Sequence, residues 1–300
     1  MKKNNSLIKP LPTEQVNPRT QGLDKMTPLQ IARAINREDF TAARVVKKAA
    51  PQIAAAMIMA AKTYAAGNKI IFIGAGTSGR LGILEAVECV PTFGTKPSQI
   101  IGLIAGGRSA VFRAKEGAED DDKQGGAEIS NAARKGDFVI GLTASGRTPY
   151  VMGALQAARK IGAATALVSC NPEADTANAA IHICLQTGAE ALSGSTRMKA
   201  GTATKMTLNA ITTGAMALCG KTYGNLMIDV RPTNEKLVLR AIRLICQVSG
   251  ADERTARQLL NDSGKQVKTA VVMYRKKTDR KQAEKLLKKE RGFLTRVIDA

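Results

Sequence analysis

Two short stretches rich in glycine, serine and threonine carry the side chains of this sequence that are best suited to bind an anion. Residues 74–80 read GAGTSGR and residues 143–149 read TASGRTP. Each stretch follows an apolar, β-rich run and precedes a helical one. It would therefore lie at a helix N-terminus, where backbone N–H groups are unpaired and the helix dipole is positive. The residues predicted to bind a phosphate group in these loops are Thr77, Ser78, Gly79, Thr143, Ser145, Gly146 and Thr148.

The first loop also matches the G-x-G-x-x-G pattern of dinucleotide-binding proteins, through Gly74, Gly76 and Gly79. That pattern needs an acidic residue at the end of the next strand to bind the ribose hydroxyl, and the corresponding run here ends in LIAGG. Hydroxyl groups and free N–H groups suit a compact phosphate better than a pyrophosphate bridge. We therefore expect no dinucleotide and no other cofactor.

The second loop and a later segment could both serve only to cap helices. Ser145 and Thr148 are favoured capping types, and alone they leave capping and ligand binding equally supported. Two such loops at the carboxyl ends of parallel strands, where ligands bind in open α/β sheets, favour ligand binding. For residues 187–205, which read TGAEALSGSTRMKAGTATK, both alternatives stay open.

Histidine and cysteine offer little for catalysis or metal binding. The one histidine, His182, stands in the apolar run AAIHICL, where a strand position is predicted. The five cysteines are scattered, and no two have the C-x-x-C spacing of a zinc site, so we expect neither a metal nor a disulfide framework. Acid–base chemistry would then rest on carboxylates, Lys, Tyr or Cys.

The elements that must position the two loops alternate between short apolar runs and helical stretches. Because the runs are nearly continuous in apolar residues, they predict strands covered on both faces. The alternation predicts an α/β fold with a doubly wound, mainly parallel sheet in three layers. Helices are expected over residues 27–66, split at Pro51, and over about 195–220. The predicted strands are residues 69–74, 99–107, 137–142, 164–169 and 180–185.

The chain divides by composition into three parts. Residues 1–20 are polar and contain proline, and they predict a flexible tail. Residues 21–232 form the predicted α/β domain, and residues 233–300 a small domain of basic helices. No apolar run is long enough for a membrane span, and no secretory signal is visible at the start, so a soluble, cytoplasmic protein is expected.

The formal net charge is +20, and its distribution bears on possible partners. Residues 231–300 hold 18 Lys and Arg against 8 Asp and Glu, a net +10 on the outside of amphipathic helices. Only 3% of the residues are aromatic and none is Trp, so few side chains could stack on bases. A solvated helical surface is the favoured interpretation, nucleic acid is disfavoured as a partner, and weak attraction of an anionic substrate remains open.

Five strings of this sequence are distinctive: IGAGTSGRLGILEAVECVPTFG, LIAGGRSAVFRAKEGAEDD, LTASGRTPYV, SGSTRMKAGTATK and YGNLMIDVRPTNEKL. Through them, in matching order and spacing from about residue 20 to its end, the chain resembles the N-acetylmuramic acid 6-phosphate etherases. One local difference is EAVECVP, where many relatives have a small residue and a second proline. The resemblance implies the sugar isomerase (SIS) fold, a homodimer, and removal of the D-lactyl ether from N-acetylmuramate 6-phosphate in cell-wall amino-sugar recycling.

The same resemblance implies roles for individual residues. The family's phosphate pocket falls on Ser78, Thr143, Ser145 and Thr148. Its two catalytic glutamates fall on Glu88, as the acid that protonates departing lactate, and on Glu119, as the base. From the residues alone, Glu85 and Glu116 would serve equally well.

The implied chemistry is consistent with the residue types. In the ring-opened sugar the ether carbon is β to an aldehyde, so removal of the C2 proton lets lactate leave, and water then adds to the double bond. One carboxylate and one carboxylic acid suffice, and the acid must keep its proton, which burial favours. Glu88 stands among apolar residues, where burial is expected. A non-catalytic sugar-phosphate sensor like the glucokinase regulatory proteins, a SIS-type transcription regulator and an aldose–ketose isomerase are the alternatives.

Overall fold

The computed structural model describes residues 11–230, 232 and 234–299. Its centre is a five-stranded sheet in the order β2-β1-β3-β4-β5, and every neighbouring pair is parallel. The predicted α/β class and parallel sheet are confirmed, and each strand lies within one of the predicted apolar runs. The strands are β1 (Ile70–Gly74), β2 (Ile100–Ile104), β3 (Phe138–Leu142), β4 (Ala164–Ser169) and β5 (Ile181–Cys184).

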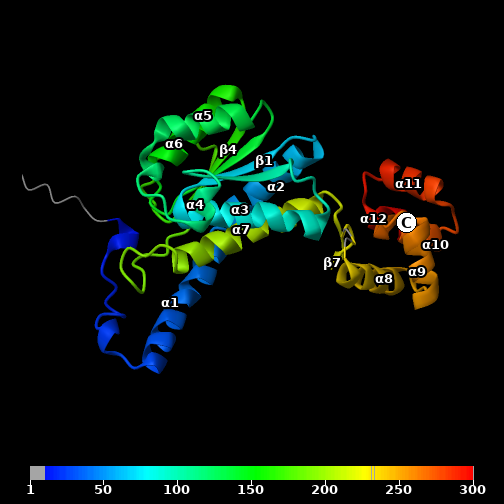
Figure 1. The fold of residues 1–300 in the computed structure, drawn as a ribbon, viewed down its shortest axis with the longest axis horizontal. Helices are drawn as coiled ribbons and strands as arrows, with labels where there is room; N and C mark the ends of the chain where they lie inside the picture. The colour runs from blue at the N-terminus through cyan, green and yellow to red at the C-terminus, as the bar shows by residue number, and fades with distance from the viewer. Residues whose placement is uncertain (1–10, 231, 233, 300) are drawn as a thin grey trace, which may run out of the picture.

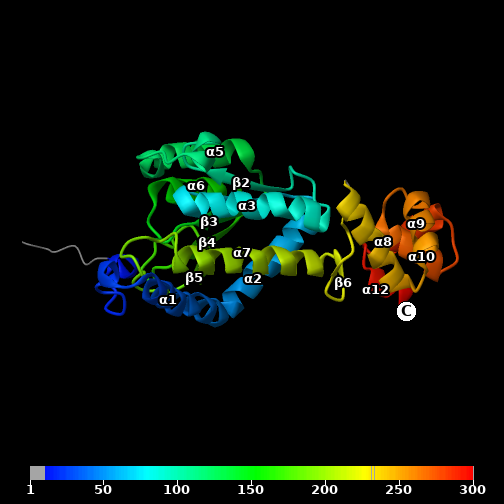
Figure 2. The same cartoon turned by 60° about the horizontal axis from the view of Figure 1, so that its bottom comes forward.

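Both faces of the sheet are covered by helices, which explains why the strands read as continuous apolar runs. Ile70 and Phe72 pack into one core, whereas Ile71 and Ile73 pack into another on the opposite face. Helices α1, α2, α3 and α7 cover the first face, and α5 and α6 cover the second, as Figure 2 shows. The three layers follow from this alternation of side chains along each strand.

The helices of the α/β body begin and end where local sequence favours it. Thr27 caps α1 in a reciprocal capping box with Gln30. The break between α1 and α2 falls at Ala49, because Pro51 has no N–H and fits only the first turn of a helix. These helices are α1 (Pro28–Lys48), α2 (Ala50–Ala65), α3 (Gly76–Phe93), α4 (Ser109–Phe112), α5 (Asp122–Ala132), α6 (Pro149–Ile161) and α7 (Lys199–Leu218), with the 3-10 turn η3 (Ala118–Asp120) before α5.

The link from β1 to α3 is unusually tight, and α3 begins within the first predicted loop. A Cβ atom on Gly79 would lie 2.6 Å from the carbonyl oxygen of Gly74 and 2.6 Å from Cγ1 of Ile104. Side chains are therefore excluded at Gly79 by the backbone of the preceding strand. Two of the three glycines that imitate a dinucleotide motif, Gly74 and Gly79, are thus required by packing, whereas Gly76 has a positive φ of 51°.

Residues beyond α7 form a second hydrophobic core with its own helices, beside the α/β body (Figure 1). Its buried residues extend from Ile228 to Ile298, close to the predicted domain boundary at residue 233. The division into two domains stays a prediction that this separate core supports. The elements here are β6 (Thr222–Tyr223), β7 (Leu226–Met227), α8 (Glu235–Ser249), α9 (Glu253–Asp262), α10 (Val267–Arg275), α11 (Arg280–Lys289) and α12 (Leu294–Ile298).

The N-terminal segment differs from the expected tail over its described part. Residues 11–20 lie against the body, with Thr13 and Asn17 buried, and they include the 3-10 turn η1 (Pro12–Glu14). A second 3-10 turn, η2 (Leu23–Lys25), leads into α1. Residues 1–10 lie outside the described residues.

Candidate functional site

A cavity of about 260 Å³ opens at the carboxyl ends of β1 and β3, which are neighbours in the sheet. Of the predicted phosphate-binding residues, five line it with their side chains or backbone. Gly79 and Gly146 belong to the same two loops but are buried behind the lining. The lining residues are Thr13, Glu14, Ala75, Gly76, Thr77, Ser78, Glu119, Leu142, Thr143, Ala144, Ser145, Thr148, Gly194 and Thr196.

Three hydroxyl groups of the second loop meet at this cavity. Oγ1 of Thr143 lies 2.6 Å from Oγ1 of Thr148 and 3.1 Å from Oγ of Ser145. Thr148 is the N-cap residue of α6, yet its side chain makes no capping hydrogen bond. Capping alone therefore does not explain Thr148. The backbone N–H groups of Gly146 and Arg147 also donate to the hydroxyls of Thr143 and Ser145, so Thr148 is the hydroxyl with bonding capacity left for a ligand.

The first loop contributes a helix N-terminus. The N-cap residue of α3 is Ala75, which has no side-chain oxygen to accept a bond from the first-turn N–H groups. Gly76, Thr77 and Ser78 form that first turn and line the cavity. Unpaired N–H groups and the positive end of the helix dipole together favour an anion at this point. Since no Lys or Arg is among the described lining residues, neutral donors of this part of the chain would do the binding.

The third glycine- and hydroxyl-rich segment both lines the cavity and caps a helix. Gly194 and Thr196 lie in the cavity wall. The N-terminus of α7 is already occupied, because the buried carboxylate of Glu190 accepts from the N–H groups of Lys199 (3.2 Å) and Ala200 (2.9 Å). Burial raises the pKa of Glu190, although these bonds oppose the change. The α7 terminus is thus a capped helix end, separate from the anion site of α3.

Sequence reasoning missed Thr13 and Glu14, which lie in the same cavity wall. Their segment is fastened to the body through Glu38 of α1, which is only 2% exposed. Asn17 donates to Glu38 Oε2 over 2.9 Å, and Arg19 donates through Nε over 2.6 Å. No local pattern signals this contact, since a polar, proline-containing stretch also fits a tail.

The carboxylate of Glu38 is held in its charged form by these partners. Lys199, itself 1% exposed, donates to Oε2 over 2.6 Å. Burial alone would raise the pKa of Glu38, but the bonds from Arg19, Lys199 and Asn17 outweigh it and lower the pKa to about 2. The N-terminal segment and the start of α7 are therefore tied to α1 by one buried carboxylate.

Glu119 lies in the cavity wall, on the 3-10 turn η3. It also borders an adjoining cavity of about 120 Å³, which Arg80, Lys115 and Glu116 line as well. Arg80 donates to the carbonyl oxygens of Val111 (2.9 Å) and Ala110 and so fixes the α4 segment beside this second space. Of the two acidic candidates in this cluster, only Glu119 lines the cavity where residues 74–80 and 143–149, the two phosphate-type loops, meet. Glu116 borders the first loop through the adjoining cavity.

Glu88 is not among the residues that line the cavity. It lies ten residues after Ser78 on α3, roughly 15 Å along the helix axis at 1.5 Å per residue. Its side chain is exposed, next to the exposed apolar side chains of Leu84 and Val87. The prediction that Glu88 is buried is therefore wrong for a single chain.

The buried carboxylate of α3 is Glu85, one turn earlier. It accepts hydrogen bonds from Asn209 and Thr212 of α7. Burial raises the pKa of Glu85, although these two bonds oppose the change. The helical repeat places Glu85 and Cys89 on the inner face of α3, and Glu88 on the outer face.

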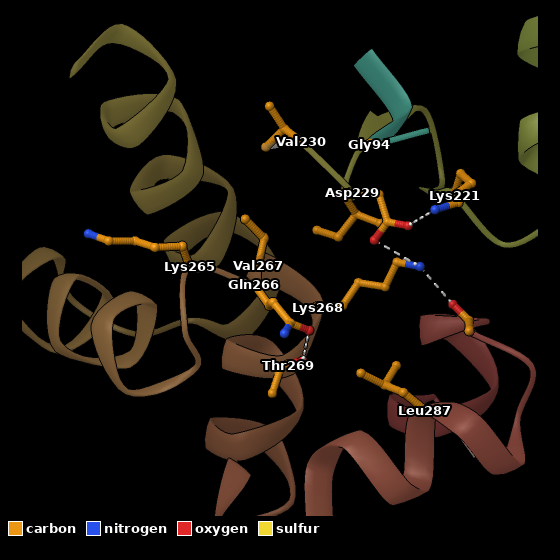
Figure 3. Close-up of a pocket in the computed structure, with 12 residues that line it drawn as sticks. Gly94, Lys221, Asp229, Val230, Lys265, Gln266, Val267, Lys268, Thr269 and Leu287 are labelled. Carbon is orange, nitrogen blue, oxygen red and sulfur yellow. Dashed lines mark hydrogen bonds and ion pairs between the residues drawn. The ribbon is translucent and has the colours of Figure 1, made fainter. Parts of the chain in front are cut away.

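A cavity of about 410 Å³ lies between the α/β body and the second core, around Asp229 (Figure 3). Asp229 pairs with Lys221 (2.8 Å) and Lys268 (3.0 Å), and Lys268 also donates to the carbonyl oxygens of Gly220 and Gly292. One carboxylate thus faces two ammonium groups, and the cluster joins the two cores.

Neither a metal cluster nor a membrane-spanning helix is present among residues 11–230, 232 and 234–299. Within these ranges no group of three or more His, Cys, Asp and Glu side chains could hold a metal ion. No helix there is long and apolar enough to cross a membrane. His182 lies on β5 as predicted, where its ring nitrogen is 2.8 Å from the hydroxyl oxygen of Ser169.

This chain is similar to known proteins over part or nearly all of its length. The family description "Glucokinase regulatory protein N-terminal SIS domain" matches residues 52–159. An N-acetylmuramic acid 6-phosphate etherase of Oenococcus oeni is 47% identical over 96% of this chain and 98% of its own length. One of Serratia proteamaculans is 46% identical over the same shares. A solved phosphoheptose isomerase from Francisella tularensis is 13% identical, with a TM-score of 0.47 over 64% of this chain and 98% of its own.

Proposed function

Because this chain belongs to the N-acetylmuramic acid 6-phosphate etherase family, we propose that it cleaves the D-lactyl ether of N-acetylmuramate 6-phosphate in this cavity. The products are N-acetylglucosamine 6-phosphate and D-lactate, and the setting is recycling of cell-wall amino sugars in the cytoplasm. The observation that carries the site assignment is that Glu119 shares one cavity with the hydroxyl and N–H donors of both phosphate-type loops.

The 6-phosphate is bound by the first turn of α3 and the hydroxyl groups of Thr143, Ser145 and Thr148. These donors are held in place before the substrate arrives, since the three hydroxyls already contact one another. The phosphate then serves as a handle that orients C2 and C3 of the sugar, so that binding energy far from the reacting atoms is used for orientation.

Elimination follows from the ring-opened aldehyde. Glu119 removes the proton from C2, the electron pair forms the C2–C3 double bond, and the C3–O bond to lactate breaks. Glu88 donates its proton to the departing lactate oxygen. Water then adds to C3 and a proton returns to C2, which restores both carboxyl groups and completes a sequence that needs no oxidant or reductant.

Glu88 is not among the described residues that line the cavity of its own chain, so its proposed role requires a second copy, and the proposal therefore includes a homodimer. The outer face of α3 carries Leu84, 47% exposed, and Val87, 60% exposed. Between α3 and the edge strand β2 lies an apolar groove of about 500 Å³, lined in part by Ile83, Val87 and Ile101. A second copy placed on this face would bury apolar surface and carry Glu88 toward the partner's cavity.

Lactate release from the 6-phosphate and from the unphosphorylated sugar tests the function and the phosphate handle together. We expect turnover of the phosphorylated substrate and a large loss of kcat/KM without the phosphate. Ligand binding without lactate release would contradict the enzyme assignment. Equal kcat/KM for the two sugars would contradict the phosphate site.

Mixing two inactive variants tests whether Glu88 acts across the dimer. Glu88→Gln and Glu119→Gln chains would be unfolded together and refolded as a mixture. If each site combines Glu119 of one chain with Glu88 of the other, hybrid dimers contain one intact site, and about a quarter of the wild-type activity returns. If both residues act within one chain, no hybrid is active and the mixture stays as inactive as its components.

A further inference from the structure

The segment before α1 supplies a carboxylate to the cavity that the proposed reaction has not yet used. Glu14 lines the cavity together with Glu119, and these are the two ionisable side chains among its described lining residues. Glu14 comes from the turn Pro12–Glu14 and is exposed, so its carboxylate is open to solvent and to a ligand in the cavity.

Hydrogen bonds of the residues before and after Glu14 in the sequence fix its position. Before it, the carbonyl oxygen of Thr13 accepts from the N–H group of Gly194 over 3.2 Å, which joins two parts of the cavity wall. After it, the side chain of Asn17 donates to Glu38 and also to the carbonyl oxygen of Ala189 over 3.2 Å. The segment is thus held by a hydrogen bond across 172 residues of sequence and by the ion pair of Arg19 with the buried Glu38.

The chemistry of the substrate requires a ring-opening step, with two proton transfers, to which the two catalytic carboxyl groups have not been assigned. Elimination needs an aldehyde at C1, but a 6-phosphorylated amino sugar is mostly a closed hemiacetal ring. Opening it moves a proton from the C1 hydroxyl and delivers one to the ring oxygen. A carboxylate beside the sugar performs both transfers and ends unchanged.

We propose that Glu14 contacts the sugar and opens its ring before Glu119 acts. The Glu14 carboxylate accepts the proton of the C1 hydroxyl, the C1–O5 bond breaks as the C1 carbonyl forms, and Glu14 returns the proton to O5. The hydroxyl-lined floor of the cavity holds the phosphate, and the two carboxylates act on the uncharged part of the sugar. This proposal rests on the proposed etherase function.

Lactate release by Glu14→Gln at increasing enzyme concentration is the test. Without Glu14, turnover waits for spontaneous ring opening, so the rate of lactate release at high enzyme concentration falls by about 100-fold or more. The rate then stops rising with enzyme concentration and increases when imidazole, a general acid–base catalyst of ring opening, is added. Wild-type enzyme shows a rate proportional to its concentration and no response to imidazole.

Two control variants test whether the effect belongs to the carboxyl group of Glu14 in the cavity. Glu14→Asp keeps a carboxylate and is expected to retain a rate proportional to enzyme concentration. Asp24→Asn removes an exposed carboxylate from the same segment outside the cavity and is expected to match the wild type.

The proposal is overturned if Glu14→Gln is as active as the wild type, or if its rate is low but stays proportional to enzyme and indifferent to imidazole. Failure of the proposed function has a different signature, because the wild type itself would then release no lactate.

Discussion

At the cavity, three neutral hydroxyl groups contact one another, and the N-terminus of α3 has no capping side chain. At Glu38 and Asp229, charged side chains meet partners of opposite charge that occupy their hydrogen-bonding positions. Both kinds of cluster are polar and partly buried, yet only the first adjoins a helix N-terminus whose N–H groups have no side-chain acceptor. The difference teaches that uncapped N–H donors at a cavity favour a binding site, and that a concentration of charge does not by itself mark one.

The largest expected effect is loss of activity in Glu119→Gln. Removing a group that transfers a proton costs about 10²–10⁴-fold in rate, whereas the thermal unfolding midpoint should stay constant because Glu119 is exposed. Lactate release and a melting curve measure the two. The matched control is Glu116→Gln, in the same acidic cluster but outside the phosphate-type cavity. If the control lost as much activity as Glu119→Gln, the assignment would move to the cluster as a whole.

The next largest effect concerns stability and belongs to Glu38→Gln. It leaves Lys199 buried without its counter-charge, for which a loss of about 3–5 kcal/mol in the free energy of unfolding is typical. The pKa of Glu38 is lowered from 4.5 to about 2, so its stabilisation is present above about pH 4.5 and disappears as the pH falls toward 2.

Urea unfolding across this pH range checks the prediction for Glu38. The wild type and Glu38→Gln should differ most near neutral pH and converge in acid. A difference that stayed constant with pH would show that the charge of the Glu38 carboxylate is not what stabilises its contacts with Arg19 and Lys199.

Asp229→Asn should destabilise the protein less than Glu38→Gln does. It leaves Lys221 and Lys268 close together without the negative charge between them, but Asp229 is 21% exposed, and solvent screening reduces the loss below the limit of about 3–5 kcal/mol for a fully buried pair. The thermal midpoint should fall while KM for the sugar phosphate stays unchanged at a temperature where the variant is folded. A rise in KM would make the junction part of the binding site and would undo the comparison.

How far the sequence determines these features depends on whether the signal is local. The five strands could be predicted because strands covered on both faces must be apolar throughout. The two phosphate-type loops could be predicted because a tight strand-to-helix turn needs glycine and an anion needs donors. Glu14 could not, since its place depends on Asn17 bonding across 172 residues. The outward position of Glu88 could not be predicted either. Leu84 and Val87 are apolar yet exposed, so the apolar pattern of α3 does not show which face is buried.

The smallest and most specific effect is expected for Thr148→Val, which removes one hydroxyl of the cavity and keeps the shape of the side chain. A hydrogen bond to a charged group contributes about 1.5–3 kcal/mol, so KM for the phosphorylated sugar should rise by about 10-fold or more while kcat changes little. Thr278→Val, at a partly buried threonine between α10 and α11, serves as the matched control and should leave KM unchanged. The unphosphorylated sugar gives the sharper comparison, because Thr148→Val and the wild type should then be equal. If the variant lost as much with the unphosphorylated sugar, Thr148 would be contacting the sugar itself, and the hydroxyl cluster would no longer stand as a phosphate site.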